Sequence, residues 1–187
     1  MKSSQKGTFN YIDQKKKLEI IKTISFFALS AAIFTIGYVT TKTKGNLLTV
    51  VAVLGCLPAS KCAVNMIMVL KIKKCSLDAK EKIIEAIGNL NGYYNLYFTS
   101  YDKNFSIAHL IVTTNSIIAF SEASSINAAD FEKHIEQILG KDGIKDMNVK
   151  LFTDLSKYVT RLNQLNESSV DITEKENVKN LLFSVSL

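Results

Sequence analysis

The chain lacks most of the residue patterns by which a cofactor or a reaction is recognised in a sequence. Its three cysteines form no C-x-x-C pair and no cluster with histidine at zinc spacing. It also has no glycine-rich phosphate loop, no dinucleotide fingerprint and no Ser/His/Asp or Cys/His arrangement. The sequence therefore predicts no bound metal and no cofactor, and it contains no complete catalytic set.

Paired cysteines are missing as well, so no disulfide framework is expected. Cys56 and Cys62 lie in one apolar run, about 9 Å apart along a helix axis and on different faces, so they cannot bridge within that helix. Cys75 stands alone after a lysine cluster. Unpaired thiols are typical of proteins in a reducing compartment.

Acidic residues are scarce in the first part of the chain. Up to Lys74 there are twelve lysines, and the only acids are Asp13 and Glu19, whereas from Cys75 onward fifteen acids face eleven bases. The net charge of +6 therefore belongs to the first part, and the second part is mildly acidic. This balance argues against a broad nucleic-acid-binding face and leaves room only for a local basic groove.

Charge is absent from the first of two long apolar runs. Residues 23–41 carry no charged side chain, and at about 1.5 Å per residue they match the roughly 30 Å hydrocarbon core of a bilayer. A second run, residues 46–70, is interrupted only by Pro58, Lys61 and Asn65. A secretory signal peptide is the alternative interpretation of the first run. Against it, the run is long, no small-x-small site follows it, and the second run comes at once.

The segment between the two runs is so short that the two helices must be antiparallel neighbours. We expect a transmembrane hairpin over residues 18–71, with helices at 18–41 and 46–71. A basic tail, residues 1–17, precedes the hairpin, and a soluble domain, residues 75–187, follows it. Lysines are more numerous on the two outer flanks than in the turn. The positive-inside rule therefore predicts a multi-pass protein of the plasma membrane with both termini in the cytoplasm.

Polar and small residues mark the second apolar run. Lys61 and Asn65 predict either a functional polar site within the membrane or a lysine that snorkels to the inner edge. Gly55, Ala59 and Ala63 recur every four residues along one face. The first helix or a second copy of the chain could pack against that face.

Apolar spacing and turn residues in the second part predict a soluble α/β domain with core order αβββαβ. The expected elements are a helix after the N-cap Ser76, strands at 93–101, 105–112 and 117–121, a helix capped by Asn127, a strand at 147–152, a helix at 155–165, and a last short helix opened by a Thr173–Glu176 capping box and ending before Phe183. This order implies one sheet with helices packed on it. The whole chain is thus predicted to be an α+β membrane protein.

One segment of the predicted domain carries a family resemblance. Residues 108–122 resemble the central hairpin of the nuclease-related domain in the restriction-endonuclease-like superfamily, whose core order is also αβββαβ. That family has Asp-His on one strand, a turn, a second strand and then Glu-x-Lys. His109 and Glu122 match this pattern, and the preceding helix offers Glu81 or Glu85 as a further carboxylate.

The resemblance spans residues 76–152 and implies metal-assisted hydrolysis of nucleic acid, but two positions depart from the family pattern. The metal-binding Asp of the family is Ala108 here, and its lysine is Ser124. Loss of a carboxylate weakens a divalent-cation site, and loss of the lysine removes an electrophilic group. The resemblance therefore implies a degenerate active site.

Each surviving candidate also has a purely structural interpretation. Glu122, at the end of a predicted strand, can be a solvated side chain. His109 can pack beside a core strand or form a local hydrogen bond, and His134 lies on the polar face of its predicted helix.

Three functions are compatible with the sequence. The first, favoured by the missing catalytic set, is a membrane-anchored, non-enzymatic interaction or scaffold module whose partner is another protein or a second copy. The second is a membrane-tethered, metal-dependent nuclease-like hydrolase with a degenerate site around Glu85, His109 and Glu122. The third is a subunit of a small oligomeric channel or transporter, motivated by Lys61 and Asn65.

Overall fold

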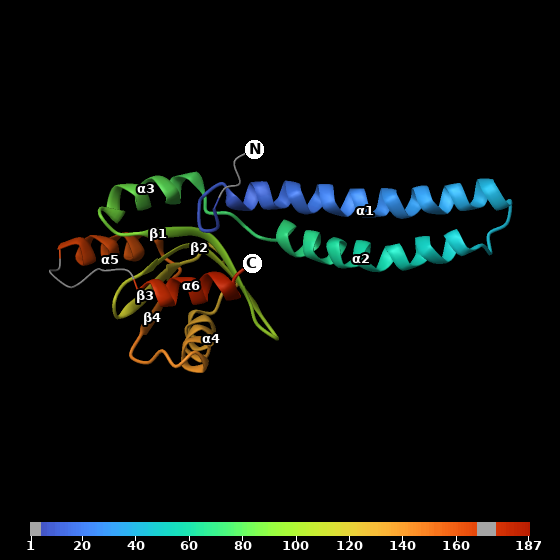
Figure 1. The fold of residues 1–187 in the computed structure, drawn as a ribbon. Helices are drawn as coiled ribbons and strands as arrows, with labels where there is room; N and C mark the ends of the chain where they lie inside the picture. Colours follow the sequence, from blue (N-terminus) through green and yellow to red (C-terminus); the bar gives the residue numbers. More distant parts are fainter. Residues whose placement is uncertain (1–4, 168–174) are drawn as a thin grey trace. The chain divides into compact units, whose positions relative to one another are not determined.

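The computed structural model describes residues 5–167 and 175–187, which form two compact units. The first unit is a helical hairpin, Ile12–Ile72, and the second is a mixed α/β domain (Figure 1). The domain contains residues from both sides of the hairpin in the sequence, up to Tyr11 and from Lys73 onward. The hairpin is therefore an insertion into a domain that is discontinuous in sequence.

The hairpin consists of α1 (Tyr11–Thr41) and α2 (Leu47–Leu70). Both helices are long and apolar enough to cross a membrane, and most of their apolar side chains are exposed. Helix α1 begins at Tyr11, so the last residues of the predicted N-terminal tail, residues 1–17, are helical. Pro58 lies within α2 and does not end it.

Two close approaches fix the register of the hairpin. A Cβ added to Gly55 would lie 2.8 Å from Ser30 Oγ, and one added to Gly37 would lie 2.7 Å from Leu48 Cβ. Both contacts fit one antiparallel register, in which moving seven residues along α1, from Ser30 to Gly37, corresponds to moving seven residues back along α2, from Gly55 to Leu48. The two helix backbones thus approach closely where one of them carries a glycine.

A seam of small residues runs between the two helices. The buried small residues recur at seven-residue spacing, at Thr23, Ser30 and Gly37 on α1 and at Ala52 and Ala59 on α2. This spacing is typical of long helices packed at a shallow angle. Of the face predicted from the sequence, Ala59 is buried, and Gly55 and Ala63 are half-buried.

The domain is built on a four-stranded sheet with the strand order β1-β2-β3-β4. Its elements are α3 (Leu77–Ile87), β1 (Gly92–Thr99), β2 (Asn104–Val112), β3 (Ser116–Phe120), α4 (Ala128–Lys141), β4 (Asn148–Phe152), α5 (Leu155–Glu167) and α6 (Glu176–Val185). The first three strands form an antiparallel meander, and β4 pairs parallel to β3 after the α4 crossover. Helix α6 continues past Phe183, the expected limit, and Thr173 of the predicted capping box lies outside the described residues.

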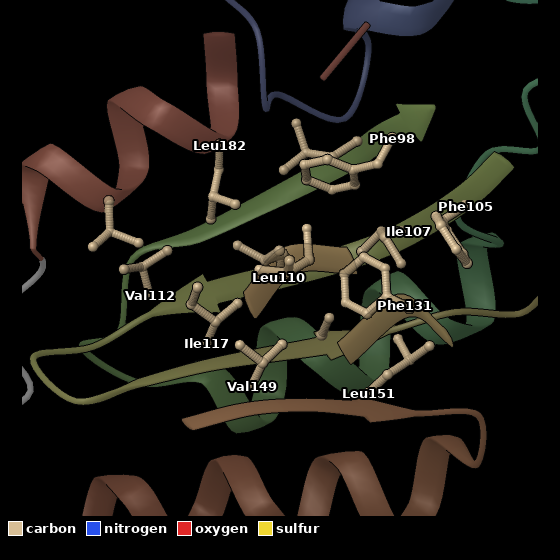
Figure 2. Packing of buried hydrophobic residues seen from close by; sticks show 14 of the residues in the cluster. Phe98, Phe105, Ile107, Leu110, Val112, Ile117, Phe131, Val149, Leu151 and Leu182 are labelled. Carbon is tan, nitrogen blue, oxygen red and sulfur yellow. The ribbon is translucent and has the colours of Figure 1, made fainter. Parts of the chain in front are cut away.

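Helices cover both faces of the sheet. On one face, α4 and α6 enclose the larger apolar cluster, in which Phe131 packs between Phe98 and Phe105 at centroid distances of 5.8 and 5.6 Å (Figure 2). On the opposite face, α3 and α5 bury a second cluster around Ile83 and Leu162. Strand residues buried on both sides explain why β2 and β3 read as nearly continuous apolar runs.

Both edges of the sheet are partly closed by other parts of the domain. On β1, the Tyr94 N–H donates to the Gly7 carbonyl at 2.7 Å, and the Leu187 N–H bonds the same strand at 2.8 Å. On β4, the Leu151 N–H donates to the Glu132 carboxylate at 3.0 Å. Open strand edges are templates for pairing with other chains, so these contacts disfavour strand addition.

Asn95 interrupts β1 with a left-handed backbone. Its φ is 58°, and its side chain is almost fully buried. The amide Nδ2 donates to the Phe9 carbonyl at 2.9 Å, and Oδ1 accepts from the Cys75 N–H at 2.7 Å. Since Phe9 precedes α1 and Cys75 follows α2, one side chain binds the chain segments on both sides of the hairpin.

We expect Asn95→Ala to lower the free energy of unfolding by about 3 kcal/mol or more. Two buried backbone groups lose their partners, and alanine disfavours a positive φ. Asn95→Gly removes the same bonds but tolerates this backbone, so it should cost about 1 kcal/mol less. Chemical denaturation of the detergent-solubilised chain, followed by circular dichroism, measures both losses. A wild-type stability for Asn95→Ala would contradict this assignment.

Candidate functional site

The three residues that the sequence singles out for catalysis come from three places in the domain. Glu85 lies on α3, His109 on β2, and Glu122 just after the end of β3. Within residues 5–167 and 175–187, no group of three or more His, Cys, Asp or Glu side chains is placed to hold a metal ion.

The alternation of side chains between the two faces of the sheet is broken at the same place in β1 and β2, and this break determines the face on which His109 lies. Tyr94 and Asn95 are neighbours in sequence, yet both side chains lie on the α3/α5 face. Opposite them, Ala108 packs in the α3/α5 cluster and His109 contacts Tyr158 of α5, so these neighbours also share that face. Strict alternation along β2 would have placed His109 under α4 and α6 instead.

His109 is fully buried and held in place on several sides. Its Nδ1 lies 2.6 Å from Tyr158 Oη, and its ring centroid lies 4.5 Å from that of Tyr94. A Cβ at Gly92 would overlap Nε2, so this imidazole requires a glycine in the neighbouring strand. Among the described residues, Nε2 is the one buried side-chain nitrogen or oxygen without a hydrogen-bond partner.

Burial lowers the pKa of His109 to about 3, so its imidazole is neutral near pH 7. An effective general base has a pKa near the working pH, which this group does not. The contacts of His109 match the structural alternative of a histidine packed in the core, although its hydrogen-bond partner, Tyr158, lies on a distant helix and is not local in sequence.

Cys75 lies in the same buried region as Tyr94 and Tyr158. Burial, and after it the charge of Glu122, raise the pKa of the Cys75 thiol to about 12. Burial and the neighbouring Cys75 raise the pKa of Tyr94 to about 12, and burial raises that of Tyr158 well above its usual value. The thiolate is the reactive form of cysteine, so a thiol that stays protonated is not a nucleophile at neutral pH. The buried polar cluster, Cys75, Tyr94, His109 and Tyr158, is therefore uncharged.

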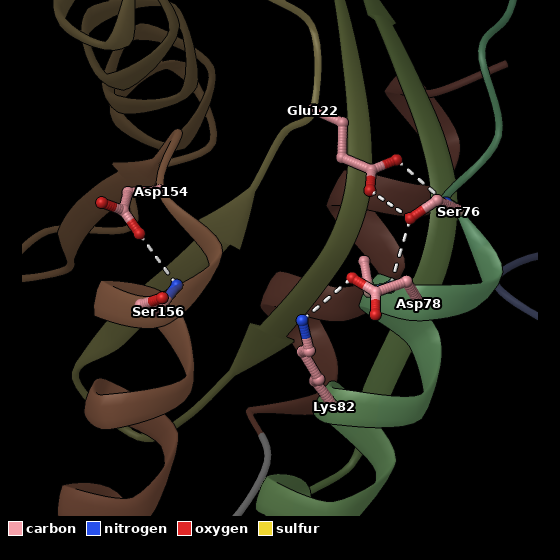
Figure 3. A network of polar contacts seen from close by, with 7 residues as sticks. Ser76, Asp78, Lys82, Glu122, Asp154 and Ser156 are labelled. Atoms are coloured by element: carbon pink, nitrogen blue, oxygen red, sulfur yellow. Dashed lines mark hydrogen bonds and ion pairs between the residues drawn. The ribbon is translucent and has the colours of Figure 1, made fainter.

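Glu122 accepts hydrogen bonds from Ser76, the N-cap residue of α3. Its two carboxylate oxygens accept from the Ser76 N–H at 2.9 Å and from Ser76 Oγ at 2.6 Å (Figure 3). Ser76 Oγ in turn caps the helix by accepting from the Ala79 N–H at 3.1 Å. A carboxylate beside a helix N-terminus is stabilised by the helix dipole. Ala108, which stands where the nuclease-like resemblance would require a metal-binding Asp, is buried among apolar side chains.

Glu85 lines a different feature, an open groove of about 430 Å³ between α3 and α5. A second groove, of about 470 Å³, lies along α5 and shares Ser156 and Thr160 with the first. Neither groove is lined by His109 or Glu122. Leu77 and Ile84 add exposed apolar surface to α3, one heptad apart.

The polar residues predicted within the membrane lie on the outside of the hairpin. Lys61 and Asn65 are exposed on α2, one helical turn apart. Neither side chain forms a hydrogen bond or ion pair with any residue that the structure describes.

Sequence reasoning missed the residues that organise this face of the domain. Asn95 was detectable, because asparagine is depleted in strands, tolerates a positive φ and here interrupts an aromatic run. The partnership of His109 with Tyr158 had no local signal, since the two residues are 49 positions apart.

Similarity to known proteins gives no functional assignment. Comparison with protein-family models, with curated proteins and with solved structures finds no match for this chain. Its function is therefore inferred from the contacts within its two units.

We expect the buried histidine to make the domain sensitive to acid. A folded-state pKa of about 3 against about 6.5 in the unfolded chain means that the unfolded state binds the extra proton between these values. Stability should be complete above pH 6.5 and fall toward pH 3, by at most about 1.4 kcal/mol per pH unit from this group. Denaturation midpoints measured at several pH values should show a shallower slope for His109→Gln. The control His134→Gln removes the half-buried second histidine, whose pKa is also lowered, by partial burial and by Lys141, so it should flatten the slope less than His109→Gln does. Equal slopes for His109→Gln and the wild type would contradict the assignment.

Proposed function

We propose that this chain is a membrane-anchored interaction module. The helical hairpin crosses the plasma membrane, and the α/β domain binds a protein partner in the cytoplasm. The observation that carries the proposal is the engagement of two of the three candidate catalytic groups, Glu122 and His109, in structural contacts, while Glu85 lines an open groove. Glu122 is bound to Ser76, and His109 is neutral and buried, whereas the α3/α5 grooves are open.

The exposed apolar surface of the hairpin supports membrane anchoring. Side chains such as Val39 and Leu57, each 68% exposed, point away from the seam along both helices. Apolar surface of this extent is unfavourable in water and favourable in lipid. Two antiparallel helices also satisfy their own backbone hydrogen bonds, as the hydrocarbon core requires.

Contacts within the domain support a topology with both ends of the hairpin on one side of the membrane. Gly7 and Phe9 precede α1, and both bond to β1 of the domain. The rest of that domain follows α2 in the sequence. The excess of lysines on the outer flanks over the turn, which carries only Lys42 and Lys44, points to the cytoplasmic side.

The nuclease-like hydrolase is the second candidate, and the observed order α3-β1-β2-β3-α4-β4 is what favours it. It would require Glu122 to leave Ser76 and bind a cation without a carboxylate at position 108. An oligomeric channel subunit would require several copies to turn Lys61 and Asn65 toward a shared passage.

We expect cysteine labelling to place the domain in the cytoplasm. Cys75 is 3% exposed and would resist a maleimide on either side, so Tyr101→Cys, at a fully exposed position, is the informative variant. In a Cys56→Ala/Cys62→Ala background, it should react with a membrane-impermeant maleimide only after permeabilisation. Gly45→Cys in the turn should react in intact cells. Labelling of Tyr101→Cys from outside would overturn the proposed topology.

We expect Thr160→Arg, which places a long cation where the two α5 grooves meet, to reduce partner binding at least tenfold. The matched control, Asn180→Arg, adds the same charge on the exposed surface of α6 and should leave binding unchanged. Quantitative mass spectrometry of proteins that copurify with the full chain in mild detergent compares the two variants. Equal recovery from both, or magnesium-dependent cleavage of nucleic acid by a chain without a partner, would contradict the proposal.

A further inference from the structure

The register of the hairpin determines the level at which its charges lie. The contacts of Ser30 with Gly55 and of Gly37 with Leu48 place Lys22 of α1 level with Ala63 of α2. Lys61 is two residues from Ala63, about 3 Å along the axis. The charge-free stretches of the two helices therefore end at nearly the same level, with Lys22 on one helix and Lys61 on the other.

Beyond this level lies the hairpin base, residues 12–22 of α1 and 61–72 of α2. Its acids are Asp13 and Glu19, and Glu19 is paired with Lys22 at 3.1 Å. Its lysines are Lys15, Lys16, Lys17, Lys22, Lys61 and Lys71. The base is thus strongly cationic, whereas the turn at the opposite end carries only two lysines.

Three lysines of the base are available to bind a ligand, as far as the described residues show. Lys17, Lys61 and Lys71 are exposed, and their side chains form no hydrogen bond or ion pair with a described residue. Lys61 and Lys71 are about 15 Å apart along α2, and the headgroup layer of a bilayer is roughly 5–7 Å thick. With their long, flexible stems, the two lysines can reach that layer from its two sides.

Apolar side chains are interleaved with these lysines. Val64 and Ile67 lie between Lys61 and Lys71 on α2 and are 56% and 49% exposed. The Asn65 amide adds a hydrogen-bond donor one turn from Lys61. A soluble phosphate would satisfy the cations alone, whereas a phospholipid also covers the apolar side chains with its acyl chains.

We propose that the hairpin base is a collar that binds anionic phospholipid headgroups of the cytoplasmic leaflet. The phosphate oxygens of the lipid accept from Lys17, Lys61 and Lys71. Lysines near an anionic membrane surface bind it with roughly additive strength. This inference rests on the membrane anchoring proposed above and adds a lipid preference to it.

The test uses the full chain in nanodiscs of phosphatidylcholine containing a minor fraction of phosphatidylglycerol. Native mass spectrometry of the released protein measures how far phosphatidylglycerol is enriched among the bound lipids. We expect enrichment for the wild type and its loss, by about fivefold for each lysine removed, in Lys17→Gln/Lys61→Gln/Lys71→Gln. The matched control, Lys42→Gln/Lys44→Gln in the turn, should keep the wild-type enrichment.

Three outcomes would overturn the collar. They are no enrichment for the wild type, equal loss in the base and turn variants, and displacement of the lipid by millimolar glycerol phosphate, which would identify a soluble phosphate as the ligand. Unchanged circular dichroism of the triple variant confirms that it is folded. A chain that fails to enter nanodiscs counts against membrane anchoring and the collar together, whereas a chain that enters without lipid preference counts against the collar alone.

Discussion

The side-chain amide of Asn95 is the interaction on which the arrangement of the domain depends. It bonds Phe9 and Cys75, which are far apart in sequence because the whole hairpin lies between them. Closing so long a loop costs chain entropy. Antiparallel pairing of α1 and α2 offsets much of this cost, because it brings the two ends of the hairpin together. Folding of the domain around Asn95 and pairing of the two helices therefore support each other.

The same residue shapes the chemistry of the interior. The left-handed backbone at Asn95 turns two consecutive side chains of β1 toward α3 and α5, and the paired residues of β2 follow. His109 is thereby drawn into a buried, uncharged cluster beside Tyr158. Its unpartnered Nε2 costs about 1–3 kcal/mol, a penalty that the surrounding packing must offset. The position of His109 follows from the backbone of β1 at Asn95, which bonds the segments on both sides of the hairpin, so the unpartnered nitrogen gives no reason to infer catalysis.

Local sequence patterns predicted the helices and strands, whereas the surroundings of the candidate site residues depend on contacts between residues far apart in the sequence. The order αβββαβ and the caps Ser76 and Asn127 follow from spacing and capping chemistry, and the structure has them. The start of α1 at Tyr11 was missed because charged residues in its first turns resemble a solvated tail. The packing of Gly7 and Phe9 on β1 could not be predicted, since it depends on partners more than 80 residues away.

Among the described residues, the surfaces open to a binding partner lie on helices and not on the edges of the sheet. Gly7 and Leu187 bond to one sheet edge and Glu132 to the other, which disfavours strand addition. The buried polar cluster is uncharged, and its members other than Tyr94 are buried. What is left open is groove surface of mixed polarity on α3 and α5 and a cationic base on α1 and α2. The two surfaces differ in charge: the part of the domain from Cys75 onward, which carries both grooves, is mildly acidic, whereas the base is cationic and would be attracted to an anionic membrane. This charge difference is consistent with the two proposals, lipid binding at the hairpin base and a protein partner at the α3/α5 surface.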